Sequence, residues 1–175
     1  MNKKITIIII VLAFISTAVT AQTKMKEYKA GHVFNISLPD YMNKTIGLND
    51  VSAIEYKSEV KEVYGFVIYD LKEDLKLVEL NFNSAKEFYD GFMQDFLKDV
   101  EKKSISNPVS KKISETNFIE ADVEYFDKEA NMEIYYLIGI VETKKAFYKV
   151  LSWTSKEKKD TFKADFQKIL YSLKD

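Results

Sequence analysis

Seven short segments of this 175-residue sequence have the side-chain pattern of β-strands. Successive residues of a strand point to opposite faces of a sheet, so a period of two predicts a strand. In the first segment Phe34, Ile36 and Leu38 share one face, and polar residues occupy the other. The predicted strands are residues 33–38, 51–59, 63–71, 109–116, 118–126, 132–141 and 146–153. A chain with this pattern has to fold around a sheet.

Two of these segments, residues 63–71 and 132–141, are apolar on both faces. Such a strand has to be covered on both sides, which places it inside a sheet that lies between two layers. Short turns join several consecutive strands, and short connections favour antiparallel pairing. The pattern therefore predicts an antiparallel sheet with cover on both faces.

The first of two predicted helices begins at a capping box formed by Ser84 and Glu87, whose side chains satisfy free amides of the first turn. Asn107 and Pro108 end it. Apolar residues follow the capping box at helical spacing and predict one buried stripe. The stripe consists of Phe88, Phe92, Met93, Phe96, Leu97 and Val100.

The second predicted helix closes the chain. Thr154 and Glu157 form another capping box in front of it. Its apolar face consists of Phe162, Phe166, Ile169, Leu170 and Leu173. The assignment of residues 72–80 is ambiguous. Two amphipathic helices are enough to cover both faces of the sheet.

The first 21 residues predict a cleavable signal peptide. Lys3 and Lys4 form a positive start, and an apolar run of about 11 residues follows, too short as a helix of about 16 Å to cross a bilayer core of about 30 Å. Small residues then predict cleavage between Ala21 and Gln22. We expect a periplasmic or secreted protein with no membrane span after cleavage. Residues 22–30 form a polar lead-in, and residues 31–175 form a single α+β domain.

Composition excludes several kinds of chemistry. The sequence contains no cysteine, which excludes disulfides, thiol catalysis and cysteine metal sites. It also contains no arginine, and without Lys3 and Lys4 the 24 remaining lysines face 27 acidic residues, a net charge of −3. This balance argues against a nucleic-acid partner, which requires a strongly basic face.

The order of elements resembles the Mog1/PsbP-like fold. The resemblance rests on the opening strand Phe34–Pro39, the helix after the third strand, the long hairpin over residues 118–141 and the closing helix that ends at Ile169–Leu173. It implies an α/β/α sandwich around an antiparallel sheet of six to seven strands with two main helices. It also implies a non-catalytic binding or accessory function, because members of this fold are mostly photosystem subunits, a small-GTPase partner and exported bacterial proteins.

Aromatic residues are the candidate binding groups. Tyrosine can be half buried and still offer a hydroxyl, so a group of tyrosines suits a pocket or a protein-binding patch. The alternative is that these rings pack under the helices, because strands favour aromatic residues in any case. The candidates are Tyr41, Tyr56, Tyr64, Tyr69, Tyr135, Tyr136 and Trp153.

Catalytic and metal-binding motifs are missing. His32 is the only histidine and has no neighbouring ligand in the sequence, so a catalytic triad or a histidine metal site lacks its partners. Two acidic clusters do not match a calcium loop, and a solvated surface explains them better. They are Asp70-Glu73-Asp74 and Asp127-Glu129-Glu133. No cofactor, metal site or catalytic residue is predicted.

We therefore expect a non-catalytic binding or accessory protein that contacts another envelope or secreted protein. Such a protein needs an exposed apolar or aromatic patch. The alternative is a carrier of a small ligand in a tyrosine-lined pocket of about 300 Å³ or more. A hydrolase that uses carboxylates or a metal ranks third, and it requires two acidic groups in one cleft with shifted pKa values.

Overall fold

The computed structural model describes residues 23–175, so the predicted signal peptide and its cleavage site at Ala21 and Gln22 lie outside the described residues. The strands are β1 (Met25–Ala30), β2 (Phe34–Pro39), β3 (Asn43–Thr45), β4 (Ile54–Ser58), β5 (Val63–Leu71), β6 (Lys103–Ile105), β7 (Val109–Ile113), β8 (Thr116–Asp127), β9 (Met132–Glu142) and β10 (Ala146–Ser155). The helices are α2 (Lys72–Leu77), α3 (Ala85–Asp95) and α4 (Lys159–Tyr171), and a 3₁₀ turn, η1 (Lys156–Lys158), precedes α4.

The main sheet has eight strands in the order β3-β4-β5-β10-β9-β8-β6, and β7 pairs with the other half of β8. Every pairing is antiparallel, as predicted. β1 and β2 form a separate two-stranded hairpin. The count exceeds the predicted six to seven because β3 and β6 contain three residues each, too few to show a period in the sequence.

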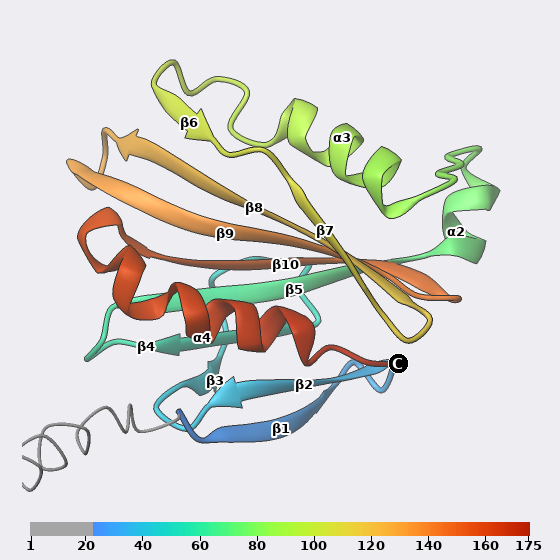
Figure 1. Ribbon diagram of the computed structural model, residues 1–175, viewed down its shortest axis with the longest axis horizontal. Helices are drawn as coiled ribbons and strands as arrows, with labels where there is room; N and C mark the ends of the chain where they lie inside the picture. The colour runs from blue at the N-terminus through green and yellow to red at the C-terminus, as the bar shows by residue number, and fades with distance from the viewer. Residues whose placement is uncertain (1–22) are drawn as a thin grey trace, which may run out of the picture.

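Three layers make up the molecule (Figure 1). Helix α3 lies over one face of the main sheet, and α4 lies over the other face together with the β1–β2 hairpin (Figure 1). The core on the α4 side contains the fully buried rings of Tyr135 and Phe166, and the core on the α3 side contains Phe88 stacked on Phe147 at 4.5 Å between ring centroids. This arrangement confirms the predicted α+β fold with two main helices.

Strand β5 shows why residues apolar on both faces predict a central position. Its bounds, Val63–Leu71, coincide with the predicted segment. Val63 and Val67 belong to the core under α4, whereas Phe66 belongs to the core under α3. Since both faces are covered, neither face can be polar, and the alternation typical of an exposed strand is lost.

Helix α4 packs closely on the sheet at Gly139 of β9. A Cβ atom at this position would lie 2.3 Å from Cδ1 and 2.9 Å from Cδ2 of Leu170, which is fully buried in α4. Only a residue without a side chain lets the helix pack this near to the strand.

Acidic side chains of β8 bind α4 through lysines. Lys163 Nζ lies 2.6 Å from Asp122 Oδ2, and Lys159 Nζ lies 2.7 Å from Glu124 Oε1. Burial raises the pKa of Asp122, but hydrogen bonds from Lys163 and Tyr135 outweigh it, so the pKa lies below its usual range. The Lys159 hydrogen bond likewise lowers the pKa of Glu124. The polar face of β8 is thus an electrostatic contact with the helix.

The predicted polar lead-in at residues 22–30 contains strand β1. Gly31 and His32 form the turn to β2, with φ values of 55° and 58°, and the Val33 amide donates to the Ala30 carbonyl at 3.0 Å. Two consecutive residues at positive φ make the type I′ turn that suits hairpins. β1 escapes detection because only Ala30 of its six residues is buried.

The two predicted capping boxes differ in outcome. Ser84 does cap α3, since its Oγ accepts the Glu87 amide at 3.2 Å. Thr154 does not cap α4: it is buried in β10 and donates to the Glu62 carbonyl at 2.9 Å. β10 continues to Ser155, and α4 begins only at Lys159. A strand that runs two residues longer therefore displaces the helix start.

Helix α3 is also shorter than predicted. It ends at Asp95 rather than near Asn107, because Phe96 leaves the helix and Leu97 adopts a left-handed φ of 54°. The Phe96 ring packs edge-on against Tyr136 at 5.7 Å, so the apolar stripe stays on the sheet without remaining helical. Residues 72–80, whose assignment from the sequence is ambiguous, contain the short helix α2.

Candidate docking surface around helix α2

The seven predicted aromatic residues do not gather on one surface. Tyr56 and Tyr135 are fully buried in the core under α4, and Tyr41 and Tyr69 pack against the same core. Tyr64, Tyr136 and Trp153 lie on the opposite face, in the core under α3. The sheet therefore separates the seven rings into two groups of four and three.

The group on the α3 side forms a continuous stack across four strands. The Tyr64 and Trp153 ring centroids lie 5.6 Å apart, those of Trp153 and Tyr136 5.3 Å, and those of Tyr136 and Tyr125 6.1 Å, all with interplanar angles below 27°. Tyr125 is not among the residues predicted from the sequence. It could not be identified from the sequence, because the cross-strand neighbours of a ring follow from the strand order and register, which the sequence does not give.

Tyr41, on the other side, is held by α4. Its hydroxyl donates to Asp165 Oδ2 at 2.8 Å, and Thr23 Oγ1 donates to the same oxygen at 3.0 Å. Burial raises the pKa of Tyr41, and the Asp165 hydrogen bond raises it further. Tyr41 is thus a structural donor that fixes the N-terminal segment on α4.

Exposed apolar side chains gather instead around α2. We define the α2 surface by four residues that line neighbouring hollows: Val51, Leu75, Val78 and Leu80. Three of them are largely exposed, with exposed fractions of 72% for Val51, 63% for Val78 and 51% for Leu80. Single exposed apolar residues are ordinary, whereas a group of neighbouring ones is a candidate interaction site.

Leu75 lies at the centre of this surface because it lines three neighbouring hollows. The largest, of about 470 Å³, also touches Val51, Tyr69 and Val78. The other two, of about 190 Å³ and 50 Å³, both touch Leu80 and Phe82. The β3–β4 loop and the segment after β5 therefore form one continuous, hollowed apolar surface.

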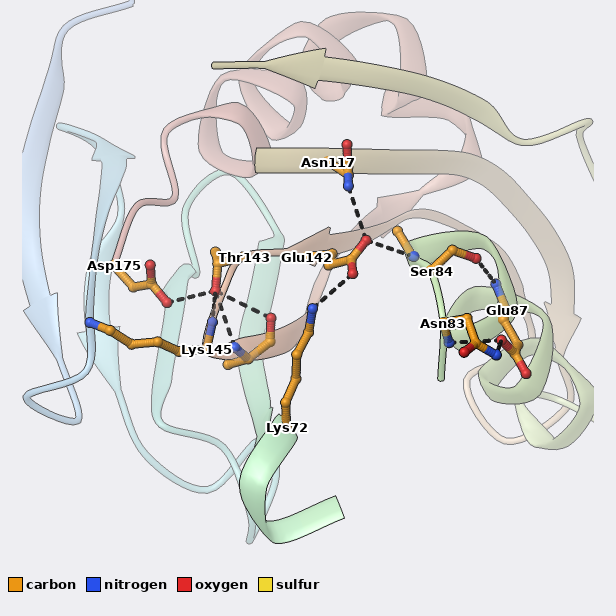
Figure 2. Close-up of polar contacts among 11 residues, drawn as sticks. Lys72, Asn83, Ser84, Glu87, Asn117, Glu142, Thr143, Lys145 and Asp175 are labelled. Carbon is orange, nitrogen blue, oxygen red and sulfur yellow. Dashed lines mark hydrogen bonds and ion pairs between the residues drawn. The ribbon is translucent and has the colours of Figure 1, made fainter. Parts of the chain in front are cut away.

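A single carboxylate fixes the segment that carries most of this surface. Glu142, the last residue of β9, accepts a hydrogen bond from Lys72 Nζ at 2.8 Å through Oε1. Its Oε2 accepts the Ala85 amide at 2.9 Å and Asn117 Nδ2 at 3.0 Å (Figure 2). Since Lys72 begins α2 and Ala85 begins α3, both ends of the segment 72–85 meet at Glu142. Burial raises the pKa of Glu142, but its donors outweigh this and lower it.

A second carboxylate fixes the loop that carries Val51. Glu55 of β4 is buried and accepts the amides of Leu48 at 2.8 Å and Asn49 at 3.0 Å, and Ser52 Oγ donates to it at 2.9 Å. Burial raises the pKa of Glu55, but these hydrogen bonds outweigh it and lower the pKa. The two parts of the α2 surface are thus each held to the sheet by a bound carboxylate.

An ion pair lies at the floor of this surface. Lys149 Nζ lies 2.8 Å from Asp70 Oδ2, and both residues line the hollow of about 190 Å³. Asp74 lines the hollow of about 470 Å³ and has no lysine partner among residues 23–175. The apolar surface therefore carries a free negative charge at its rim.

The acidic clusters and His32 show no catalytic arrangement within the described part of the chain. Asp127 accepts the amides of Glu129 and Ala130, both at 2.9 Å, and so closes the β8–β9 turn. Glu133 pairs with Lys156 at 3.1 Å. His32 is exposed in the β1–β2 turn. Among residues 23–175, no three acidic or histidine side chains lie close enough to hold a metal ion.

The described residues also contain no helix that is both long and apolar enough to cross a membrane. The chain matches no family model. No curated protein matches its sequence.

An antiparallel sheet between α3 on one face and α4 with a hairpin on the other defines an α+β sandwich, and solved structures share it. Cyanobacterial PsbP (CyanoP) from Synechocystis superposes with a TM-score of 0.63 at 14% identity, over 91% of this chain and 96% of that one. The yeast Ran-binding protein Mog1p gives 0.58 at 7% identity, over 87% and 96%.

LpqN, a Mycobacterium tuberculosis protein involved in cell envelope biogenesis, gives a TM-score of 0.56 at 8% identity, over 87% of this chain and 90% of that one. The chain has the Mog1/PsbP-like fold, as its order of elements predicted. At these identities the likeness establishes the fold, and function has to be argued from the surface itself.

Proposed function

We propose that this chain is an exported, non-catalytic binding protein that acts through contact between its α2 surface and a second envelope or secreted protein. The observation that carries the proposal is the group of exposed apolar side chains around Leu75, presented on two loops that Glu142 and Glu55 hold in place. A surface held in this way loses little conformational freedom on binding, which favours affinity. The Ran-binding Mog1p is a precedent for protein binding by this fold.

Photo-crosslinking tests the contact directly. A benzophenone amino acid at Val78 is expected to crosslink the partner in cells of the source organism. Val60 is the matched control, because it is also an apolar residue, is 96% exposed, and precedes β5 whereas α2 follows it. The nine residues of β5 separate the two positions by about 26 Å.

Charge substitutions in protein without the crosslinker provide the second half of the test. Val78→Asp should abolish co-purification of the partner identified by crosslinking, whereas Val60→Asp should leave it unchanged. The proposal fails if both positions crosslink the same proteins, or if Val78→Asp leaves the complex intact.

Export is tested by the mass of the purified protein. We expect the mature chain to begin at Gln22, and a Val19→Lys, Ala21→Lys double variant to retain its N-terminus, because a signal peptidase requires small uncharged residues there. A protein recovered at full length from the cytoplasm would contradict export while leaving the contact at the α2 surface to be judged separately.

A further inference from the structure

A cavity of about 580 Å³ lies far from the α2 surface, between the chain that leaves α3 and the end of β8. Leu97 and Val100 form one wall, and Tyr125 and Phe126 form the other. It borders the turn that precedes Met132, whereas the α2 surface is anchored at Glu142, so the length of β9, about 33 Å, separates the two. A volume of several hundred Å³ suits a small molecule.

Tyr125 gives this cavity an aromatic wall with one free face. It is the last ring of the four-ring stack, and Tyr136 covers one of its faces at 6.1 Å. The other face lies on the side of β6, whose Lys103 is the strand partner of Tyr125 and donates to the Leu97 carbonyl. Among residues 23–175 no second ring and no lysine ammonium group lies over this face, so we call it the free face. The segment 97–102 that lines the cavity leads into β6. Phe126, the next residue of the strand, also lines the cavity and is 41% exposed. The free face of an aromatic ring attracts cations.

The charges that line the cavity select the same kind of ligand. Four carboxylates and two lysines line it, which leaves two negative charges: Asp99, Glu101, Asp127 and Glu129 against Lys102 and Lys128. The Asp127 carboxylate already accepts hydrogen bonds from two backbone amides. Within residues 23–175 the other three carboxylates take part in no ion pair, so their field is not neutralised by a bound lysine.

We propose that this cavity binds a small organic cation with a flat apolar or aromatic body. The body stacks on the free face of Tyr125 beside Leu97 and Val100, and the ammonium group lies near Glu101 or Asp99. This site is independent of the proposed contact at the α2 surface, so each can fail without the other.

Isothermal titration calorimetry with two probes tests the site on the mature chain. Tryptamine carries an indole ring and a positive charge, and indole-3-acetate carries the same ring and a negative charge. We expect saturable 1:1 binding of tryptamine that is at least about tenfold tighter than binding of indole-3-acetate, which corresponds to about 1.4 kcal/mol. Backbone amide NMR shifts on addition of tryptamine should concentrate in residues 97–102 and 125–129.

Matched variants test whether the ligand binds at the free face of Tyr125. Tyr125→Leu should weaken tryptamine binding about tenfold or more. Tyr64→Leu removes the ring at the opposite end of the same stack and should change the affinity less than about twofold. Glu101→Lys, on the exposed segment after α3, should reverse the preference between the two probes without disturbing the fold.

The proposal is overturned if tryptamine shows no saturable binding up to about 10 mM. It is also overturned if the anionic probe binds the wild-type chain as tightly, or if Tyr64→Leu weakens binding as much as Tyr125→Leu does.

Discussion

Glu142 and Lys72 join β9 to α2 through a hydrogen-bonded ion pair of 2.8 Å, and the same carboxylate holds the first amide of α3. We expect Glu142→Gln to lower the free energy of unfolding by about 1–3 kcal/mol, because a half-buried charged hydrogen bond is lost. Amide hydrogen exchange in residues 72–85 should accelerate more than in β5, because both ends of that segment lose their anchor.

Glu115→Gln is the matched control for this experiment. Glu115 also pairs with a lysine, Lys144 at 2.6 Å, but both side chains are exposed. An exposed ion pair contributes little, so exchange in residues 72–85 should not change. Equal exchange rates in the two variants would show that Glu142 does not hold the segment.

Acid should destabilise the fold through carboxylates bound at α4. Burial raises the pKa values of Asp122 in β8 and Asp165 in α4, but hydrogen bonds from Lys163 and Tyr135 to Asp122, and from Lys168, Tyr41 and Thr23 to Asp165, outweigh it. The pKa of Glu124 is lowered by its Lys159 hydrogen bond, so all three pKa values are lower in the folded chain than in the unfolded chain. Their contribution is therefore complete above the unfolded values of about 3.9 for Asp and 4.3 for Glu, and it is lost as the pH falls through the lower folded values. Urea unfolding should give constant stability from about pH 8 to 5 and a steady decline below about pH 4.

Asp122→Asn tests this assignment. The variant should be less stable at neutral pH and should lose less stability between about pH 5 and 3 than the wild type, because one of the titrating groups is gone. An unchanged pH profile would show that Asp122 does not contribute to the loss of stability in acid.

The Mog1/PsbP-like arrangement of layers could be predicted from the sequence because its physical cause is local. Residues 63–71 are apolar on both faces, and a strand with that pattern has to be central whatever its neighbours are. Ser84 caps α3 through an amide three residues away, so its role is also visible in a short stretch of sequence.

The errors have tertiary causes. Thr154 fits a helix cap by spacing, but the pairing of β10 with β9 keeps it extended. Gly31 and His32 form a type I′ turn without the Asn-Gly sequence that usually signals one. Leu97 adopts a left-handed φ where the Phe96 ring packs on Tyr136, and that contact depends on a strand 40 residues away in the sequence.

The α2 surface could be predicted from the sequence less well than any part of the fold. Val51 and Val78 come from different loops and meet only because Glu55 and Glu142 hold those loops to the sheet. Residues 72–80 contain several apolar residues, but the sequence leaves this segment ambiguous, so it gave no assignment from which the surface could be predicted.

Gly139→Ala should lower the free energy of unfolding by about 1–3 kcal/mol, because the new Cβ would overlap the buried side chain of Leu170. The Gly139→Ala, Leu170→Ala double variant should be more stable than the sum of the two single effects predicts, since the second change removes the overlap. Thermal or urea unfolding of the four proteins measures this coupling.

Gly91→Ala provides the opposite case. Gly91 lies inside α3, and a Cβ there would meet Phe82 at 3.4 Å, an ordinary contact at its lower limit. Alanine favours a helix by about 1 kcal/mol over glycine, so this variant should be as stable as the wild type or more stable. A loss at Gly91 as large as that at Gly139 would contradict the geometric explanation.

Tyr56 and Ser152 share a hydrogen bond of 2.8 Å in the core, and both residues are buried. Tyr56→Phe should lower the free energy of unfolding by about 1–2 kcal/mol, because the Ser152 hydroxyl is left without its partner. Adding Ser152→Ala should recover part of that loss, since the unsatisfied hydroxyl is removed as well. Additive losses in urea unfolding would contradict an energetic coupling between the pair.

The outer border of the sheet is divided between two short strands. β6 and β7 each cover part of β8, and residues 106–108, which end in Pro108, interrupt the border between them. Lys103, Lys111 and Lys112 lie along it, and the opposite border, β3, has three residues. Within residues 23–175 neither border of the main sheet offers a long, uncharged row of amides and carbonyls, which disfavours the addition of strands from neighbouring molecules at these two borders.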